Sequence, residues 1–216
     1  ANASGPTNGE ILLCDGRKPE SVAIIHCVGS RDKNYHEYCS QICCMYSLKQ
    51  AHLIKERTRA SVYQMYIDLR CAGKGYEEFL NHVAEEGINF VRGKVSEVTD
   101  KTTGEEPPDK LIVITEETLL GAVLRVPVDM VVLASAVEPQ QDAEAVGRLF
   151  GISRSADGFF MERHPKLDPI GTMNDGILIA GCAHSPKDIP QTVAQAQAAA
   201  ARVLATIARG NISLDA

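Results

Sequence analysis

The stretch Ile24–Lys49 reads IIHCVGSRDKNYHEYCSQICCMYSLK. It holds four of the chain's seven cysteines, which are Cys27, Cys39, Cys43 and Cys44. The apolar run before Cys27 is typical of a buried strand, so we expect a strand over residues 21–27, then a loop, and then a helix over residues 35–57. In an open parallel sheet, ligands bind outside the carboxyl ends of the strands. This order therefore predicts a binding site beside Cys27.

The spacing of these cysteines leaves several chemistries open. Cys39 and Cys43 would share one face of the expected helix. Cys44 is turned from Cys43 by about 100°, so the adjacent pair can bind one object only beside a helix end or a distorted turn. Four thiolates suit an iron–sulfur cluster. Tetrahedral zinc is a second candidate, although its sites usually pair two C-x₂₋₄-C units. A redox disulfide and buried inert thiols are the other interpretations.

Composition bounds the class of protein. The chain has 216 residues, which is enough for one large domain or two small ones, and a net charge of −6. No basic stretch suggests nucleic acid, no apolar run approaches the roughly 20 residues needed to span a bilayer, and the start carries no secretory signal. An odd number of cysteines argues against a secreted disulfide framework and favours a reducing cytoplasm. Residues 1–20, with Cys14, are interpreted as a linker or the edge of a longer protein.

Alternating strand and helix patterns after residue 57 predict a layered α/β fold. The expected elements are strands at 60–69, 88–91 and 128–134 and a helix at 76–86. Short alternating segments between residues 94 and 128 surround a Gly/Pro-rich turn, which is typical of a β-meander. The run at 128–134 is almost continuously apolar, as in a buried parallel strand.

The last third carries a second candidate binding segment. The expected elements are helices at 142–150 and from 191 to about 209, with strands at 158–161 and 176–183. The latter strand ends in small residues and leads to a helix N-terminus, where Asp188 is suited to cap the helix and Pro190 to its first turn. This arrangement suits a phosphate, flavin or carboxylate group. It equally suits tight packing of a helix on a sheet, and the pattern alone leaves both open.

Three segments resemble a known family. They are IIHCVGSRD with YCSQICCMYSLKQA, the strand DMVVLASAVEP, and GILIAGCAHSPKDIPQTVAQAQAAAARV. Together they resemble the A subunit of CoB–CoM heterodisulfide reductase and related flavin-binding subunits of electron-transfer complexes in sulfate reducers. The resemblance covers nearly the whole chain after residue 20. The cysteine segment is its specific part, whereas the other two are variants of signatures shared across thioredoxin-reductase-like flavoproteins.

The resemblance implies a domain organisation. Residues 21–136 would form a Rossmann-like three-layer α/β domain of the NAD(P)-binding type with a β-meander insertion, and residues 137–216 the C-terminal portion of an FAD-binding domain. In ordinary relatives the first strand of the former runs into G-x-G-x-x-G. Here Cys27-Val28-Gly29-Ser30-Arg31-Asp32 stands in that place. The resemblance thus implies that the crevice holds a cluster instead of a nicotinamide cofactor.

The resemblance also implies cofactor contacts. The ligands of a 4Fe-4S cluster would be Cys27, Cys39, Cys43 and Cys44. The FAD segment would comprise Gly181, Cys182, Ala183, Lys187, Ile189, Pro190, Gln191 and Thr192. Cys182 stands where typical flavoproteins carry an aspartate that holds the ribityl chain, and the helix N-terminus would stabilise reduced flavin through its dipole. Lys49, beyond the cysteine pair, is either a solvated lysine or a cation that favours electrons on a nearby redox centre.

The implied activity is electron transfer between cluster and FAD in a flavin-based oxidoreductase complex, with electron bifurcation as an open alternative. The implied partners are the other subunits of a heterodisulfide-reductase-like complex, with hydrogenase or formate dehydrogenase as electron donor. The chain lacks an N-terminal G-x-G-x-x-G and the C-x₂-C-x₂-C-x₃-C runs, so we expect a fragment that does not hold FAD alone. A thiol–disulfide oxidoreductase and a zinc-bound structural or docking module are the alternative functions.

Overall fold

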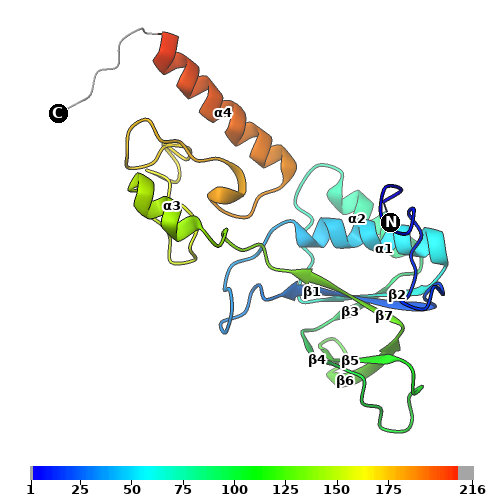
Figure 1. Ribbon diagram of the computed structural model, residues 1–216. Coiled ribbons are helices and arrows are strands. Elements are labelled where there is room, and N and C mark those ends of the chain that lie inside the picture. Colours follow the sequence, from blue (N-terminus) through cyan, green and yellow to red (C-terminus); the bar gives the residue numbers. More distant parts are fainter. Residues whose placement is uncertain (1, 209–216) are drawn as a thin grey trace. The chain divides into compact units, whose positions relative to one another are not determined.

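The computed structural model describes residues 2–208, which form two compact units (Figure 1). The first contains the chain up to Tyr38 together with Cys43–Ala136. The second contains Cys39–Ile42 and the chain from Val137 onward. Each unit is described by itself, and the assignment of residues 21–136 and 137–216 to nucleotide-type and FAD-type domains stays a prediction.

A four-stranded parallel sheet is the centre of the first unit, in the order β3-β2-β1-β7. Its strands are β1 Ser21–Val28, β2 Ser61–Tyr66, β3 Asn89–Arg92 and β7 Met130–Ser135. Parallel neighbours need crossover connections, which are supplied by helices α1 Cys43–Thr58 and α2 Tyr76–Glu85. In Figure 1 both helices cover one side of this sheet. The strands and helices predicted for this part of the chain are therefore present, with shifted ends.

A three-stranded antiparallel sheet follows within the same unit. It consists of β4 Val95–Thr99, β5 Leu111–Glu117 and β6 Ala122–Val128, in the order β4-β5-β6. This confirms the predicted β-meander. The meander lies on the side of the parallel sheet away from α1 and α2 (Figure 1).

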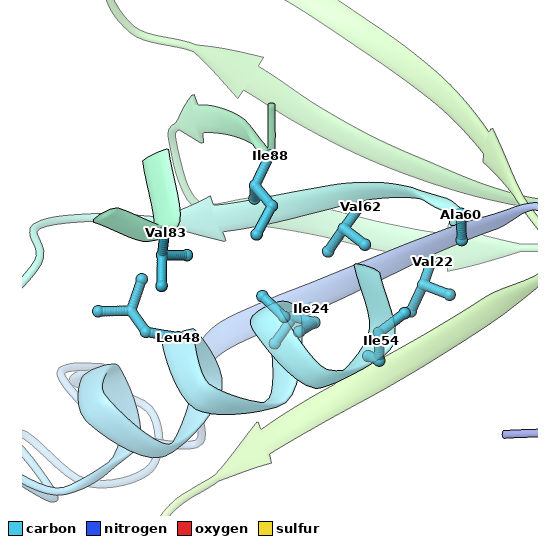
Figure 2. Packing of buried hydrophobic residues seen from close by; sticks show 9 residues of the cluster. Val22, Ile24, Leu48, Ile54, Ala60, Val62, Val83 and Ile88 are labelled. Atoms are coloured by element: carbon cyan, nitrogen blue, oxygen red, sulfur yellow. The ribbon is translucent and has the colours of Figure 1, made fainter. Parts of the chain in front are cut away.

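Alternate residues of β1 fill two separate cores. Val22 and Ile24 pack with Leu48 of α1 and with other apolar side chains from α1, β2 and α2 (Figure 2). Ala23 and Ile25 face the other side, where they pack with Met65, Val113 and Val128. Because both faces of β1 are buried, its sequence is continuously apolar instead of alternating.

The helix predicted over residues 35–57 was wrong at its start, because α1 begins at Cys43. The backbone before it is engaged elsewhere: the Arg31 amide donates to the Tyr38 carbonyl at 3.0 Å and the His36 amide to the Gly29 carbonyl at 3.2 Å. Gln41 has φ +60°, outside the helical region. Cys39 therefore lies in a loop, and the predicted helical face shared with Cys43 does not exist.

The described part of the second unit contains two α-helices and mostly irregular backbone. Helices α3 Ala143–Phe150 and α4 Ile189–Ala208 confirm the predicted helices, although the predicted end at Arg209 lies outside the described residues. None of the helices within residues 2–208 is both long and apolar enough to cross a membrane.

The strands predicted at 158–161 and 176–183 were wrong. These segments form isolated bridges, and the second ends in the 3₁₀ turn η1 Gly181–Ala183. Their backbone groups pair singly with scattered partners, as when the Ile179 amide donates to the Ile170 carbonyl at 2.8 Å. A strand requires a continuous ladder with a neighbour, which these single bonds do not provide.

Asp129 joins the beginnings of β1 and β7. Its Oδ2 atom accepts the backbone amides of Glu20 and Ser21, both at 2.9 Å, and its Oδ1 atom lies 2.6 Å from Nζ of Lys110. Burial opposes its ionisation, but the hydrogen bonds from Lys110, Ser21 and Glu20 outweigh burial and lower the pKa of Asp129 below its usual value.

Replacing Asp129 by asparagine is expected to lower the free energy of unfolding at pH 7 by about 1.5–3 kcal/mol, the scale of a hydrogen bond to a charged group. A carboxyl whose pKa is lowered by folding stabilises the fold above its unfolded pKa of about 3.9, and this contribution is lost as the pH falls through the folded pKa. The difference between the two proteins should therefore shrink in acid. Urea unfolding at pH 7 and pH 3 measures it, with the exposed Asp109→Asn as the control. An equal difference at both pH values would contradict this explanation.

Candidate functional site

Three cysteines of the first unit lie at the end of β1 and the start of α1. Cys27 is the next-to-last residue of β1, and Cys43 and Cys44 are the first two residues of α1. All three are buried, with exposed fractions of 6%, 2% and 3%. The adjacent pair therefore occupies a helix end, the condition under which neighbouring cysteines can bind one object.

The backbone at Cys27 is held in an unusual conformation. Its φ is +56°, a left-handed value that costs a residue with a side chain roughly 1–2 kcal/mol. The pairing of β1 with β7 shifts register between Ile25 and Val28, so Cys27 lies within the irregularity. Such bulges redirect side chains and are common beside active sites. The end of β1 is thus shaped around the position of this thiol.

The surroundings of Cys44 favour its thiolate form. Its hydrogen bond with Cys43 has the largest effect and lowers the pKa, while burial raises it. The His26 ring and the Arg70 amide, which lies 3.4 Å from the sulfur, lower the pKa further, to about 4. Because the thiolate is the form of cysteine that binds metals, the site has one ligand ready for coordination.

A buried series of hydrogen bonds near the cysteines links the parallel sheet to α1. The His26 ring hydrogen-bonds the side chain of Gln64, whose amide donates to the Ser47 carbonyl at 3.0 Å. His26, Gln64 and Ser47 are all buried. These hydrogen bonds fix the His26 ring, which lowers the pKa of Cys44. Sequence reasoning missed this role of His26. A histidine inside the apolar run of β1 was the available signal.

Arg31 and Tyr46 also adjoin the cysteines. Hydrogen bonding to Asp68, at 2.7 Å, raises the pKa of Arg31 most, and a hydrogen bond and charge attraction from Cys27 raise it further. Burial raises the pKa of Tyr46 to about 12, assisted by the charges of Cys43, Cys44 and Cys27. The pKa of Tyr46 thus responds to the charges of all three cysteines.

The remaining cysteines differ in their surroundings. Cys39 is half-buried, its sulfur accepts the Gln41 amide at 3.3 Å, and its segment belongs to the second unit. Its membership of the ligand set stays a prediction. Cys71 is half-buried, and burial followed by the charge of Cys44 raises its pKa. Cys14 is exposed.

The donor chemistry of the first unit fits an iron–sulfur cluster. Cluster ligands are cysteine thiolates, and their potentials respond to hydrogen bonds at the sulfurs and to solvent exposure. Here three thiols are buried together, one is ionised, and His26 and Arg31 interact with them. Zinc also takes Cys₄ sites, but among the described residues these sulfurs do not form a group of three within 4.8 Å of one another. Lys49 is exposed on α1, where water screens its charge.

In the second unit, the segment Gly181–Thr192 is fixed by its own polar contacts. Nζ of Lys187 lies 2.8 Å from Nδ1 of His184, and Nε2 of His184 lies 2.8 Å from the Glu162 carboxylate. The sulfur of Cys182 lies 3.7 Å from the Lys187 carbonyl. These contacts hold the loop between η1 and α4 in one arrangement.

The start of α4 is capped and accessible. The Gln191 amide donates to the Asp188 carboxylate at 2.7 Å, and the Asp188 amide donates to the Gln191 side chain at 3.4 Å. This reciprocal pair is a capping box and confirms the predicted cap. Cys182, Ala183, Ile189, Pro190 and Gln191 are exposed. An exposed helix N-terminus can stabilise an anionic group.

Gly181 allows α4 to approach η1. Its φ is +66°, and an added Cβ would lie 2.9 Å from Cγ2 of Thr192. Replacing Gly181 by alanine is expected to lower the free energy of unfolding by at least about 1–2 kcal/mol, because the left-handed backbone alone costs that much. Adding Thr192→Ser removes the facing methyl and should restore part of the loss in a double-mutant cycle followed by urea unfolding. Full additivity would show that this contact plays no part.

Comparisons with known proteins address the family. No family model matches the chain. The chain is 48% identical to the A subunit of the H₂:CoB–CoM heterodisulfide,ferredoxin reductase of Methanothermobacter marburgensis, over 99% of the chain and 32% of that protein. It is 42% identical to a heterodisulfide reductase A-subunit-like protein of Archaeoglobus profundus, over 96% of the chain and 29% of that protein.

The chain is a homologue of part of the heterodisulfide reductase A subunit. This confirms the resemblance seen in the three sequence segments. A further relative, the second of two iron–sulfur A subunits of the CoB–CoM heterodisulfide reductase of Methanopyrus kandleri, is 46% identical over 99% of the chain and 33% of its own length. The chain spans about a third of the length of these relatives.

Solved structures with a similar fold show the fold of this chain. Thioredoxin reductase of T. acidophilum matches with a TM-score of 0.60 at 14% identity, over 92% of the chain and 55% of that protein. Thioredoxin reductase of Lactococcus lactis matches with a TM-score of 0.59 at 18% identity, over 94% and 56%. The predicted fold class, a Rossmann-like layered domain with a part of an FAD-type domain, is confirmed.

Proposed function

We propose that this chain is an electron-transfer segment of a heterodisulfide-reductase-like flavin/iron–sulfur oxidoreductase. Cys27, Cys39, Cys43 and Cys44 bind a 4Fe-4S cluster, and residues between Gly181 and Thr192 contact FAD. The observation that carries the proposal is the placement of three buried cysteines at the end of β1 and in the first turn of α1. Nucleotide-binding relatives have their phosphate-binding glycines in this place.

The protein residues hold and tune the proposed cluster. A bound cluster supplies one-electron transfer, and FAD supplies exchange between one- and two-electron steps. Burial of the three sulfurs excludes water, and Arg31 and His26 direct positive charge or hydrogen bonds toward them. Such contacts stabilise added negative charge and raise the reduction potential. Lys49 contributes a weaker, salt-screened attraction because it is exposed.

The proposed FAD contact uses the N-terminus of α4. Asp188 is engaged in the capping box. Cys182 stands where typical flavoproteins carry an aspartate, and Cys182 and the backbone of η1 take the place of that residue. Gly181, Ala183 and Lys187 complete the loop, while Ile189, Pro190, Gln191 and Thr192 form the first turn of α4. We propose that the helix dipole and the charge of Lys187 stabilise negative charge on a reduced flavin.

The proposed partners are the other subunits of a heterodisulfide-reductase-like complex, with hydrogenase or formate dehydrogenase as electron donor. The names of the relatives support this, since they include H₂, formate and ferredoxin. A role in flavin-based bifurcation and a cytoplasmic location belong to the same proposal.

Anaerobic reconstitution of the chain with iron and sulfide tests the cluster. The expected result is about four irons and four sulfides per chain and an EPR signal after reduction, as the cluster type requires. Stoichiometric zinc held by the cysteines, with no retained iron, would replace the proposal with a zinc-bound module.

A redox thiol pair is the second candidate function, and the Cys43–Cys44 hydrogen bond favours it. An ionised thiol beside a second thiol is the arrangement used in thiol–disulfide exchange. Adjacent cysteines form a strained ring when bridged, which counts against it. Peptide mass mapping after mild oxidation of the cluster-free chain tests it, because this function requires a Cys43–Cys44 disulfide that thioredoxin-type reductants reverse.

A further inference from the structure

A second group of metal-binding side chains lies in the first unit, away from the cysteines. It consists of His52 on α1, His82 on α2, and Glu86, the residue that caps the end of α2. Nδ1 of His52 lies 2.6 Å from Oε1 of Glu86, and Nε2 of His82 lies 3.3 Å from the same oxygen. One ligand atom from each residue lies within 4.8 Å of the other two.

The fold brings these residues together for identifiable reasons. His82 and Glu86 are four residues apart and share one face of α2. His52 projects toward them from α1, where its ring meets the edge of the Phe79 ring at a centroid distance of 6.3 Å. The His52 and His82 rings have centroids 6.1 Å apart. Helices α1 and α2 lie beside each other on the sheet (Figure 1), and the cluster joins them.

One atom in the cluster lacks a partner. Oε2 of Glu86 is buried and accepts no hydrogen bond from the described residues. A buried oxygen without a partner costs about 1–3 kcal/mol, and a cation bound by both oxygens of this carboxylate would remove that cost. The group as a whole is reachable, because the side chains of His52, Glu86 and His82 are 31%, 21% and 61% exposed.

We infer that His52, His82 and Glu86 bind a divalent transition-metal ion of the zinc class. Zinc takes histidine nitrogens and carboxylate oxygens at roughly 2.0–2.2 Å, which places tetrahedral ligand atoms about 3.4 Å apart. The His82–Glu86 separation of 3.3 Å already fits. The His52–Glu86 separation of 2.6 Å must open by less than about 1 Å. Imidazole ligands select zinc, copper or nickel over magnesium and calcium.

The inferred site is separate from the cysteines and independent of the proposed function. His52 follows Cys44 by eight residues, or about 12 Å along α1 at 1.5 Å per residue. The site has three protein ligands and leaves a fourth position for water or another donor, the pattern of an open zinc site. A metal there would clamp α1 to α2 and thereby stabilise the helix that carries Cys43 and Cys44.

Zinc and cobalt binding to the 216-residue chain test the inference. His82→Ala removes the most exposed ligand and should weaken zinc binding by more than about 100-fold, since losing even an outer-shell contact costs about 10–100-fold. Glu86→Gln should act in the same direction. His164→Ala, an exposed histidine outside the cluster, is the control and should leave zinc affinity unchanged. Circular dichroism verifies that each variant is folded.

Cobalt separates this site from the thiols. Cobalt held by nitrogen and oxygen gives only weak visible bands, whereas cobalt held by thiolates gives strong near-ultraviolet charge-transfer bands. We expect the weak bands to disappear in His82→Ala and to persist in Cys44→Ser. Equal weak nitrogen–oxygen cobalt bands in His82→Ala and the unaltered chain would overturn the inference, as would cobalt spectra of thiolate type alone. Neither outcome bears on iron binding by the cysteines, so failure of the proposed cluster is recognised separately.

Discussion

Replacing Cys44 by serine is expected to leave the chain unable to hold a four-iron cluster after anaerobic reconstitution. The reason is chemical: Cys44 is the sulfur that its neighbours keep ionised, through Cys43, His26 and the Arg70 amide. A serine hydroxyl stays protonated at neutral pH and offers a poor ligand to iron. Iron and sulfide assays should fall from about four of each per chain to near zero, with loss of the EPR signal of the reduced protein.

Matched serine variants make this result specific. Cys14→Ser changes an exposed thiol and should retain the full cluster. Cys27→Ser and Cys43→Ser should behave like Cys44→Ser, because both thiols are buried beside it. Iron retention in Cys39→Ser tests whether Cys39 is the fourth ligand. Iron retention in Cys71→Ser tests whether Cys71 takes that position instead. Full iron retention in Cys44→Ser, with a folded chain by circular dichroism, would remove Cys44 from the ligand set.

The fold of the first unit could be predicted because its strongest signals are local. The continuous apolar run of β1 indicates a strand buried on both faces, and the two cores formed by Ile24 and Ile25 show why. The β-meander was recognisable from alternation around a Gly/Pro-rich turn. The second unit gave weaker signals: residues 176–183 are apolar like a strand, yet they make single hydrogen bonds instead of a ladder.

The sequence was sufficient to propose the residues of the candidate site, but it predicted their geometry only in part. Four cysteines after a strand indicated a metal centre, but periodicity placed Cys39 on a helix that begins only at Cys43. The left-handed backbone of Cys27 is a tertiary effect of the bulge against β7, and no local pattern reports it. The contributions of His26 and Arg31 depend on Gln64 and Asp68, more than 30 residues further along the chain. Sequence spacing cannot reveal such pairs.

Replacing Gly93 by alanine is expected to produce the largest loss of stability among glycine substitutions in the first unit. Gly93 joins β3 to β4, and its amide donates to the Tyr66 carbonyl at 2.8 Å. A Cβ there would lie 1.6 Å from the carbonyl oxygen of Glu116 in β5. That oxygen belongs to the backbone, so it cannot rotate away as a side chain would, and either β5 or the β3–β4 connection must move.

The cost should reach or exceed the upper end of the usual overpacking range, about 3 kcal/mol. Gly121→Ala is the matched control, because nothing lies within 4 Å of its added Cβ and its φ of +64° alone opposes the change. That variant should lose only about 1–2 kcal/mol. Urea unfolding at pH 7 measures both. A loss at Gly93 no larger than at Gly121 would mean that the meander approaches the parallel sheet less closely than the backbone of Gly93 and Glu116 indicates.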